Sequence, residues 1–132
     1  TIKENKMKGK LVGYAAVGTN DLERAKQFYD ALLSEVGASS FSPGERAYFW
    51  QVKDGGSIFA VFKPFDESEA SAGNGSMVGF PMDTKEQVDA MYAKAMELGA
   101  SDEGEPGART ENFYGAYVRD LDGNKITFYY YE

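Results

Sequence analysis

The sequence FYGAYVRDLDGNKITFYYYE, residues 113–132, is the stretch around which the rest of the chain is organised. Two runs of alternating character, 113–119 and 125–131, are rich in Tyr, Phe, Val, Ile and Thr. Between them lies DLDGN, residues 120–124, a cluster of turn-forming residues. Strand-forming runs on both sides of such a cluster predict a β-hairpin. We expect this hairpin to pair with strands that come earlier in the chain.

The first half of the chain has a strand, a helix and then further strands. Residues 11–18 are small and apolar enough for a strand, and a helix is predicted over 21–35 because its apolar residues recur every three or four positions. Asn20 is the expected N-cap, with Glu23 in the capping-box position. A short strand near 38–41 and a hairpin formed by 47–52 and 57–63 complete this half.

The same order then repeats. Residues 77–82 predict a strand, and Thr84, with Gln87 three residues later, predicts the cap of a second helix that ends at Gly99. Residues 101–110 are interrupted by Gly and Pro and are expected to be a loop or a weak edge strand. The closing hairpin follows. We therefore predict an α+β fold of two βαβββ modules, 9–65 and 77–132, joined by a connector at 66–76 within a single domain, 1–132.

Each module has one helix, which covers one face of its sheet and leaves the other face bare. Two such modules can set their bare faces together, which gives a curved mixed sheet around a central cavity. A cleft between duplicated modules is a common place for a ligand. We therefore expect a small organic molecule as the partner.

Composition excludes several classes of function. The chain of 132 residues has a formal net charge of −7 and contains no Cys and no His. Without these residues there is no disulfide, no thiolate or imidazole metal ligand and no cysteine nucleophile. An acidic chain without a basic face is not expected to bind nucleic acid. The apolar runs are too short for a membrane span of about 20 residues, and a cytoplasmic location is expected.

Several motifs are shared with one known family. They are GTNDLERA at 18–25, followed by Phe28 and Tyr29; NGS at 74–76; and YGAYVRDLDGNKI at 114–126. With these motifs in both halves, the sequence resembles the vicinal oxygen chelate superfamily, which groups glyoxalases, bleomycin-resistance proteins and extradiol dioxygenases. The resemblance implies a glyoxalase-like fold of paired βαβββ modules. It also implies a homodimer, because paired chains often complete or border the sites in this family.

Metalloenzymes of the family place a ligand on the first and the last strand of each module. On the matching motifs these positions fall on Tyr14 and Met77 for the first strands and on Thr127 for the last strand of the second module. Aligning GGSI at 55–58 with GNKI at 123–126 places the counterpart of Thr127 in the first module at Phe59. A phenol, a thioether, a phenyl ring and a hydroxyl do not replace imidazole and carboxylate. We therefore expect no metal ligands among these residues and no cofactor.

If these four side chains point inward, they define an aromatic and apolar cavity. Strand alternation adds Tyr129 to the same face. The complete predicted ligand pocket also includes Trp50 as a wall, Arg109 as an anion binder at the mouth, and Tyr117 of the closing hairpin. The alternative is that these residues pack the core between the modules, and for Trp50 a dimer contact is a further alternative. Asp120 and Asp122 are explained by the turn that they flank.

Three functions follow from this interpretation. The first is a small-molecule-binding protein of the glyoxalase and bleomycin-resistance group without a metal centre, which sequesters a drug or a metabolite. The alternative is an enzyme, namely a lyase, isomerase or dioxygenase of the same superfamily with displaced metal ligands or a metal-independent mechanism. The third is a protein-binding partner whose cavity is packed shut. The first is our prediction.

Overall fold

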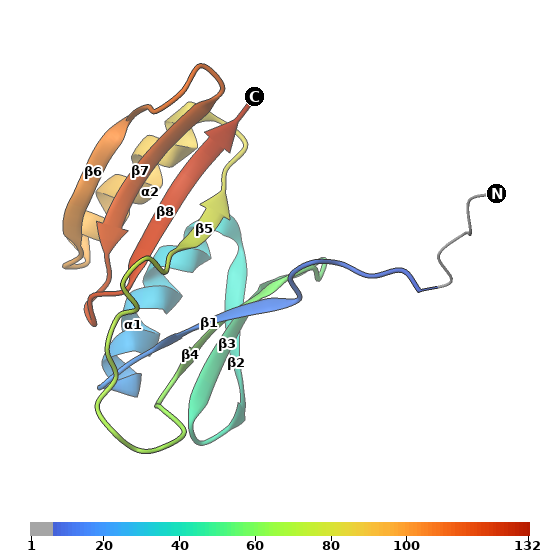
Figure 1. Cartoon of the computed structure of the whole chain (residues 1–132), viewed down its shortest axis with the longest axis vertical. Coiled ribbons are helices and arrows are strands. Elements are labelled where there is room, and N and C mark those ends of the chain that lie inside the picture. Colours follow the sequence, from blue (N-terminus) through green and yellow to red (C-terminus); the bar gives the residue numbers. More distant parts are fainter. Residues whose placement is uncertain (1–6) are drawn as a thin grey trace.

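A computed structural model describes residues 7–132 of the chain. The first six residues, which the domain prediction includes, lie outside the described residues. Eight strands and two α-helices follow one another in the order β1(Tyr14–Gly18), α1(Leu22–Leu33), β2(Ala38–Gly44), β3(Ala47–Val52), β4(Ile58–Phe62), β5(Val78–Pro81), α2(Lys85–Glu97), β6(Ser101–Ala108), β7(Phe113–Arg119) and β8(Lys125–Tyr131). A single 3₁₀ turn, η1(Ser34–Val36), extends α1 (Figure 1).

The strands form two four-stranded mixed sheets, one from each module. Their orders are β1-β4-β3-β2 and β5-β8-β7-β6, so the two modules have the same topology. In each sheet the first strand pairs in parallel with the last, and the other pairs are antiparallel. The predicted α+β class with paired βαβββ modules is confirmed.

Both helices begin where the sequence places them, but the first has a different cap. The side chain of Asp21, not that of Asn20, accepts the hydrogen bond from the Arg24 amide. Asn20 instead binds the connector through both its amide atoms, which pair with the backbone of Ala70. Thr84 caps α2 as predicted, since its hydroxyl accepts from the Gln87 amide. The connector is therefore fastened to the end of β1 by a residue expected to start the helix.

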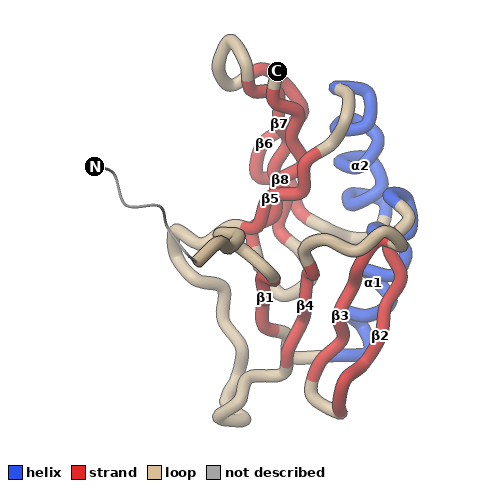
Figure 2. Tube along the Cα trace, turned by 90° about the vertical axis from the view of Figure 1, so that its right-hand side faces the viewer, coloured by secondary structure: helices blue, strands red, loops and turns tan. Residues whose placement is uncertain are grey.

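The helices and the covered faces of both sheets share one hydrophobic core. The apolar stripe predicted for α1 is buried in full: Leu22, Ala25, Phe28, Tyr29, Leu32 and Leu33. The same core contains Val88 and Met91 of α2 and Ile126 and Phe128 of β8. Figure 2 shows the helices on one side of the molecule, with both sheets beside them. The two modules thus meet through their helix-bearing sides.

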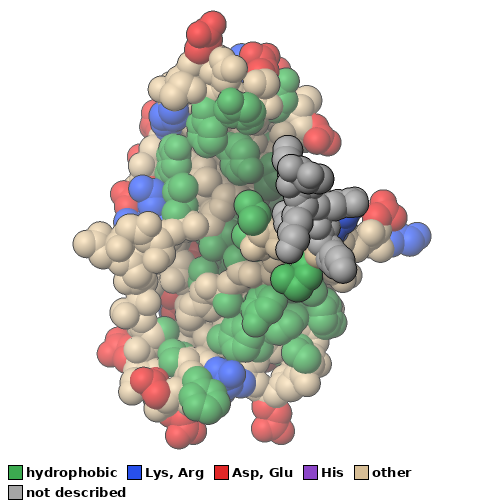
Figure 3. All heavy atoms as spheres, turned by 45° about the vertical axis from the view of Figure 1, so that its right-hand side comes forward, with side chains coloured by type: hydrophobic (Ala, Val, Ile, Leu, Met, Phe, Trp, Pro, Cys, Tyr) green, Lys and Arg blue, Asp and Glu red, His purple; other side chains and the backbone are tan. Residues whose placement is uncertain are grey.

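This packing leaves the other face of each sheet uncovered. Tyr14 is 61% exposed and Met77 is 49% exposed, although both were expected to point into a cavity enclosed by the two modules. The uncovered faces do not lie against each other within the described chain, because the modules use their helix-bearing sides for mutual contact. Hydrophobic side chains are visible on this side of the molecule in Figure 3.

The segment 101–108, expected to be a loop or a weak edge strand, is the edge strand β6. Its pairing with β7 is interrupted by two register shifts, between Asp102 and Gly104 and between Gly104 and Gly107. Bulges and an edge position are where Pro and Gly are tolerated in a sheet. The strand exists because β7 offers it a partner, which its own composition does not reveal.

Candidate functional site

The uncovered face of the second sheet gathers four of the predicted pocket residues. We define the second-module face as the side of this sheet that carries Arg109, Phe113, Tyr117, Lys125, Thr127 and Tyr129. The rings of Phe113 and Tyr129 are stacked, with centroids 5.2 Å apart and planes inclined by 9°. Gly115 lies opposite Tyr129 in the ladder, and a Cβ there would be 2.7 Å from the Phe113 ring. The glycine therefore allows Phe113 to reach across the sheet to Tyr129.

Tyr117 on the same face is bordered by two cations. The guanidinium carbon of Arg109 lies 5.2 Å from the centre of its ring, and the ammonium of Lys125 lies 5.3 Å from it. Arg109 is held in place because its Nη1 donates to the Gly107 carbonyl at 2.9 Å and its Nη2 donates to the Glu105 carbonyl at 2.6 Å. Three N–H groups of a guanidinium with five remain for other partners. Stacked rings beside two cations are suited to a planar organic anion.

Thr127 is only 2% exposed, and its hydroxyl donates to the Ala116 carbonyl at 2.9 Å. Its proton is therefore engaged within the sheet. Gly79 lies opposite Thr127 in the parallel pair, and a Cβ there would be 3.1 Å from the Tyr129 ring. Thr127 and Gly79 thus form the floor on which the Tyr129 ring rests.

The uncovered face of the first sheet carries a second group of aromatic residues. The Phe49 ring is at its centre, with centroid distances of 6.2 Å to Tyr14, 5.5 Å to Phe41 and 5.6 Å to Phe62. The guanidinium carbon of Arg46 lies about equally far from the rings of Phe62 and Phe65, at 5.1 and 5.2 Å. We call this group the first-module face. Tyr14 is on it, far from the covered core.

Trp50 and Phe59 lie on the opposite, helix-covered side of the first sheet. Both pack against the Tyr29 ring of α1, and the Trp50 indole donates to Asp30 Oδ1 at 3.0 Å. The expectation that Phe59 shares a face with Tyr14 is therefore wrong. Tyr14 pairs with Ile58, and Ala15 pairs with Phe59.

Phe59 was placed on the wrong face because the alignment of β4 with β8 was wrong by one residue. The buried pair Phe59 and Val61 of β4 corresponds to the buried pair Ile126 and Phe128 of β8, so Ala60, not Phe59, matches Thr127. A one-residue shift in a strand moves every side chain to the other face. The alignment of the turn glycines did not reveal it, because the turn before β4 and the turn before β8 place their strands differently.

The positions that hold a metal in the family's metalloenzymes do not fit a divalent ion here. Tyr14 and Met77 are exposed, Thr127 is engaged with a backbone carbonyl, and Ile58 and Ala60 offer only alkyl groups on the matching face. Among residues 7–132, no group of three or more His, Cys, Asp or Glu side chains is arranged to hold a metal ion. These side chains do not form a ligand set suited to a divalent ion.

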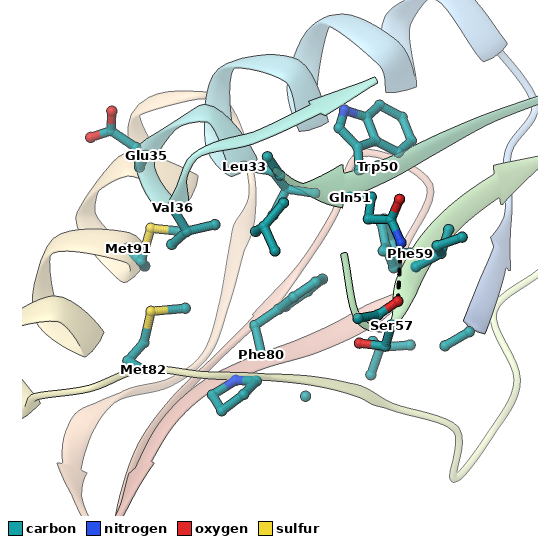
Figure 4. A pocket seen from close by; sticks show the side chains of 18 of the residues that line it. Leu33, Glu35, Val36, Trp50, Gln51, Ser57, Phe59, Phe80, Met82 and Met91 are labelled. Carbon is teal, nitrogen blue, oxygen red and sulfur yellow. Dashed lines mark hydrogen bonds between the residues drawn. The ribbon is translucent and has the colours of Figure 1, made fainter. Parts of the chain in front are cut away.

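A cavity of 830 Å³ lies between the two modules. Figure 4 shows Leu33 and Val36 at the end of α1, Phe59 and Trp50 of the first sheet, and Phe80, Met82 and Met91 of the second module around it. We call it the inter-module cleft. Of the eight predicted pocket residues, Trp50 and Phe59 line this cleft and the other six do not.

The polar contacts that join the two modules were not identified in the sequence. Asp122 accepts from the Thr19 hydroxyl at 2.6 Å and from the Asn20 amide at 3.0 Å. The Asn124 amide group donates to the Gly18 carbonyl at 2.8 Å. The turn of the closing hairpin is thereby attached to the exit of β1. The motifs GTNDL and DLDGN contact each other in the folded chain. The presence of both motifs was the feature of the sequence that could have indicated this contact.

Beneath this junction lies a buried pair. The Tyr29 hydroxyl donates to Asp120 Oδ2 at 2.5 Å, and Asp120 also accepts from the amides of Asp122 and Asn124. Burial, followed by the neighbouring Asp120 carboxylate, raises the pKa of Tyr29 well above its ordinary value. The aspartates of the turn thus hold the modules together, and no acid or base role follows from their position.

The paired modules and their uncovered faces define a glyoxalase-like protein. A family model described as Glyoxalase/Bleomycin resistance protein/Dioxygenase superfamily matches residues 11–128. The chain belongs to that superfamily. No curated protein matches it. No helix within residues 7–132 has the length and apolar character needed to cross a membrane.

Solved structures agree with this assignment. A glyoxalase/bleomycin resistance protein from Albidiferax ferrireducens T118 is 35% identical, with a TM-score of 0.84, over 93% of this chain and 100% of that chain. A hypothetical protein from S. aureus is 25% identical, with a TM-score of 0.71, over 94% of each chain. A family enzyme from Burkholderia phytofirmans PsJN, 21% identical over 91% of this chain and 98% of that chain, has a TM-score of 0.71 and shares the fold.

Proposed function

We propose that this protein binds a small organic molecule on the second-module face, without a metal centre. The observation that carries the proposal is the stacked pair Phe113 and Tyr129 on the same sheet face as Arg109, which lies against the Tyr117 ring. No helix of residues 7–132 covers this face. Aromatic rings with a fixed geometry offer a surface on which a planar molecule continues the stack. The guanidinium supplies directed donors for an anionic group of that molecule. A sequestered drug or metabolite of this kind is the function that the geometry supports best.

We further propose that the protein is a homodimer in which a second copy covers these surfaces. Large apolar side chains are exposed on or beside the uncovered faces, including Tyr14, Phe41, Met77 and Tyr131. Exposed apolar groups that gather on one side of a molecule mark an interaction surface. The first-module face of one protomer would then enclose the second-module face of its partner, and a planar ligand would be held between aromatic side chains from both.

We also propose that the two modules form a single domain. The support is the core that they share, in which the Phe59 and Phe80 rings lie 5.2 Å apart in an edge-to-face contact. Neither helix belongs to a core of its own. Residues 66–76 connect the modules, and Asn20 fixes the connector at Ala70.

Binding is tested by calorimetry with 2-naphthoate, a planar aromatic anion, and with 2-naphthylmethanol as its neutral counterpart. We expect Arg109→Gln to lower the naphthoate affinity about tenfold, which corresponds to about 1.4 kcal/mol. Tyr129→Leu removes one stacked ring and should weaken both compounds severalfold. Tyr48→Leu is the matched control, because Tyr48 lies on the helix side of the first module, where its hydroxyl donates to Glu23. Absence of binding, or equal binding by all variants, would overturn the proposal.

A further inference from the structure

The inter-module cleft is a second space in the molecule that the second-module face does not reach. It is formed by η1, β3 and β4 of one module and by β5 and α2 of the other. Its volume of 830 Å³ is within the range of roughly 300–1,000 Å³ in which small molecules are bound. Trp50 and Phe59, which line the cleft, lie on the helix side of the first sheet. Ile58 and Gly79 also line it and pair with Tyr14 and Thr127, so the cleft extends from the common core to the border of the uncovered faces.

The inner wall of the cleft is apolar. Leu33, Phe59, Met82 and Met91 are all buried members of the common core, and they turn one side toward the cleft. The edge-to-face contact between Phe59 and Phe80 closes its inner end. Methionine side chains are flexible and polarizable, so Met82 and Met91 can adapt to ligands of different outline. Such a wall receives the apolar body of a ligand.

The rim of the cleft is polar, and its charged side chains are acidic. Among the described residues that line the cleft, the charged side chains are Glu35 and Asp83, and both are acidic. Glu35 lies at the outer end, next to Val36, and its carboxylate points outward from the cleft (Figure 4). Gln51 is also at the rim, where its Nε2 donates to the Gly56 carbonyl at 3.0 Å and its own carbonyl oxygen is left as an acceptor. Carboxylates and a carbonyl favour a ligand that carries positive charge and donates hydrogen bonds.

We propose that the inter-module cleft binds an organic cation with an apolar body, such as an alkyl or aromatic ammonium compound. The body packs against the methionine and phenylalanine side chains, and the ammonium group lies at the rim beside Glu35 and Asp83. This site is independent of the proposed function, which concerns an anionic ligand on the second-module face, because none of the six residues that define that face lines the cleft. A molecule bound in the cleft contacts both modules, and it therefore stabilises their mutual packing.

Trp50 is the only tryptophan of the chain and lines the cleft, so its fluorescence reports binding directly. The probes are octylammonium and octane-1-sulfonate, which have the same alkyl chain and heads of opposite charge. We expect a saturable change in Trp50 emission with the ammonium compound, and an affinity for the sulfonate roughly tenfold weaker. No saturable change, or equal affinity for both probes, would overturn the proposal.

Two pairs of variants test the location of the site. Val36→Phe places a ring in the mouth of the cleft and should abolish the response, whereas Leu11→Phe adds the same ring at a fully exposed position as the control. Glu35→Gln combined with Asp83→Asn should reduce the preference for the ammonium probe to near unity. Glu45→Gln combined with Glu69→Gln removes the same charge away from the cleft. Undiminished binding by Val36→Phe would show that the ligand lies elsewhere and would refute the assignment.

Discussion

The Tyr29 hydroxyl lies 2.5 Å from Asp120 Oδ2, and this buried hydrogen bond joins the helix of one module to the closing hairpin of the other. The two residues are 91 positions apart in the chain. Around them, Thr19, Asp122 and Asn124 complete a polar junction between the modules. The hydrophobic core and this junction together determine how the modules are placed.

Replacing Tyr29 by Phe should destabilise the protein by about 1–3 kcal/mol, because one acceptor of the buried Asp120 loses its donor while the ring and its packing remain. Urea unfolding followed by circular dichroism measures the change. Tyr48→Phe is the matched control, since Tyr48 donates to Glu23 in an exposed position and its loss should cost less. Equal losses in both variants would show that the burial of the Tyr29 bond has no energetic importance.

Alkaline pH should weaken the protein through the same tyrosine. The folded-state pKa of Tyr29 is raised by burial, so above about pH 10 the unfolded chain releases a proton that the folded protein retains. Stability is therefore fully present below pH 10 and declines as the pH rises beyond it. The decline should be smaller in Tyr29→Phe than in the parent when unfolding free energies are compared between pH 8 and pH 11. An identical decline would contradict the assignment.

Asp122 makes three side-chain hydrogen bonds to the other module, so Asp122→Ala should weaken the junction between the modules. The side chain accepts from the Thr19 hydroxyl, the Asn20 amide and the Arg24 guanidinium. We expect a loss of about 2–4 kcal/mol in the free energy of unfolding.

The two modules of the parent protein should unfold together. Trp50 fluorescence, which reports on the first module, and hydrogen exchange of β8 should give the same denaturant midpoint of unfolding. Two separate midpoints in the parent would refute the single domain.

The metal-free proposal predicts no stoichiometric metal after chelation and reloading with zinc, nickel, iron(II), manganese or magnesium. A specific metal at 100 times its dissociation constant would add about 2.7 kcal/mol to the stability. Thermal unfolding with and without each metal measures this effect, and elemental analysis measures the content. A reproducible increase with one metal would require ligands outside the positions of Tyr14, Met77 and Thr127 and would favour an enzyme.

Dimer formation should be sensitive to the first-module face. Tyr14→Glu places a charge among the rings of this face and should shift the chain from dimer to monomer in light scattering at micromolar concentration. Glu97→Lys makes a change of charge at the exposed end of α2, on the helix side of the molecule, and should leave the dimer intact. A monomeric parent protein would refute the proposed homodimer.

The hydrophobic pattern of the sequence predicted nearly all of the architecture. The spacing in α1 identified its six buried residues, and Thr84 identified the start of α2, because both signals depend on local geometry. Asn20 was misassigned for a reason that is not local. Its side chain binds Ala70, 50 residues away, and Asp21 takes the cap. A contact made by the folded chain overrode an equally good local choice.

The candidate site was predicted less well, since it depends on the parity of strands and on how modules dock. Thr127 was placed by the family motif and Tyr129 by alternation along β8, and both do lie on one face. Tyr117, predicted as a residue of the closing hairpin, pairs with Thr127 there. Phe59 was placed on the wrong face by a shift of one residue. The packing of both helices into a single core, which leaves Tyr14 exposed, follows from the shape of the whole surface and not from any periodic pattern.

The edge strand β6 is poorly suited to pairing with a strand of another copy of this chain. Asp102, Glu103, Glu105 and Pro106 occupy it, and Pro106 lacks the amide that an added strand would need. Like charges and proline at a sheet edge oppose strand-to-strand aggregation. Near the sequence pI of about 4.6 the net charge vanishes and this repulsion fades. Acidified solutions should therefore be the ones in which the protein precipitates.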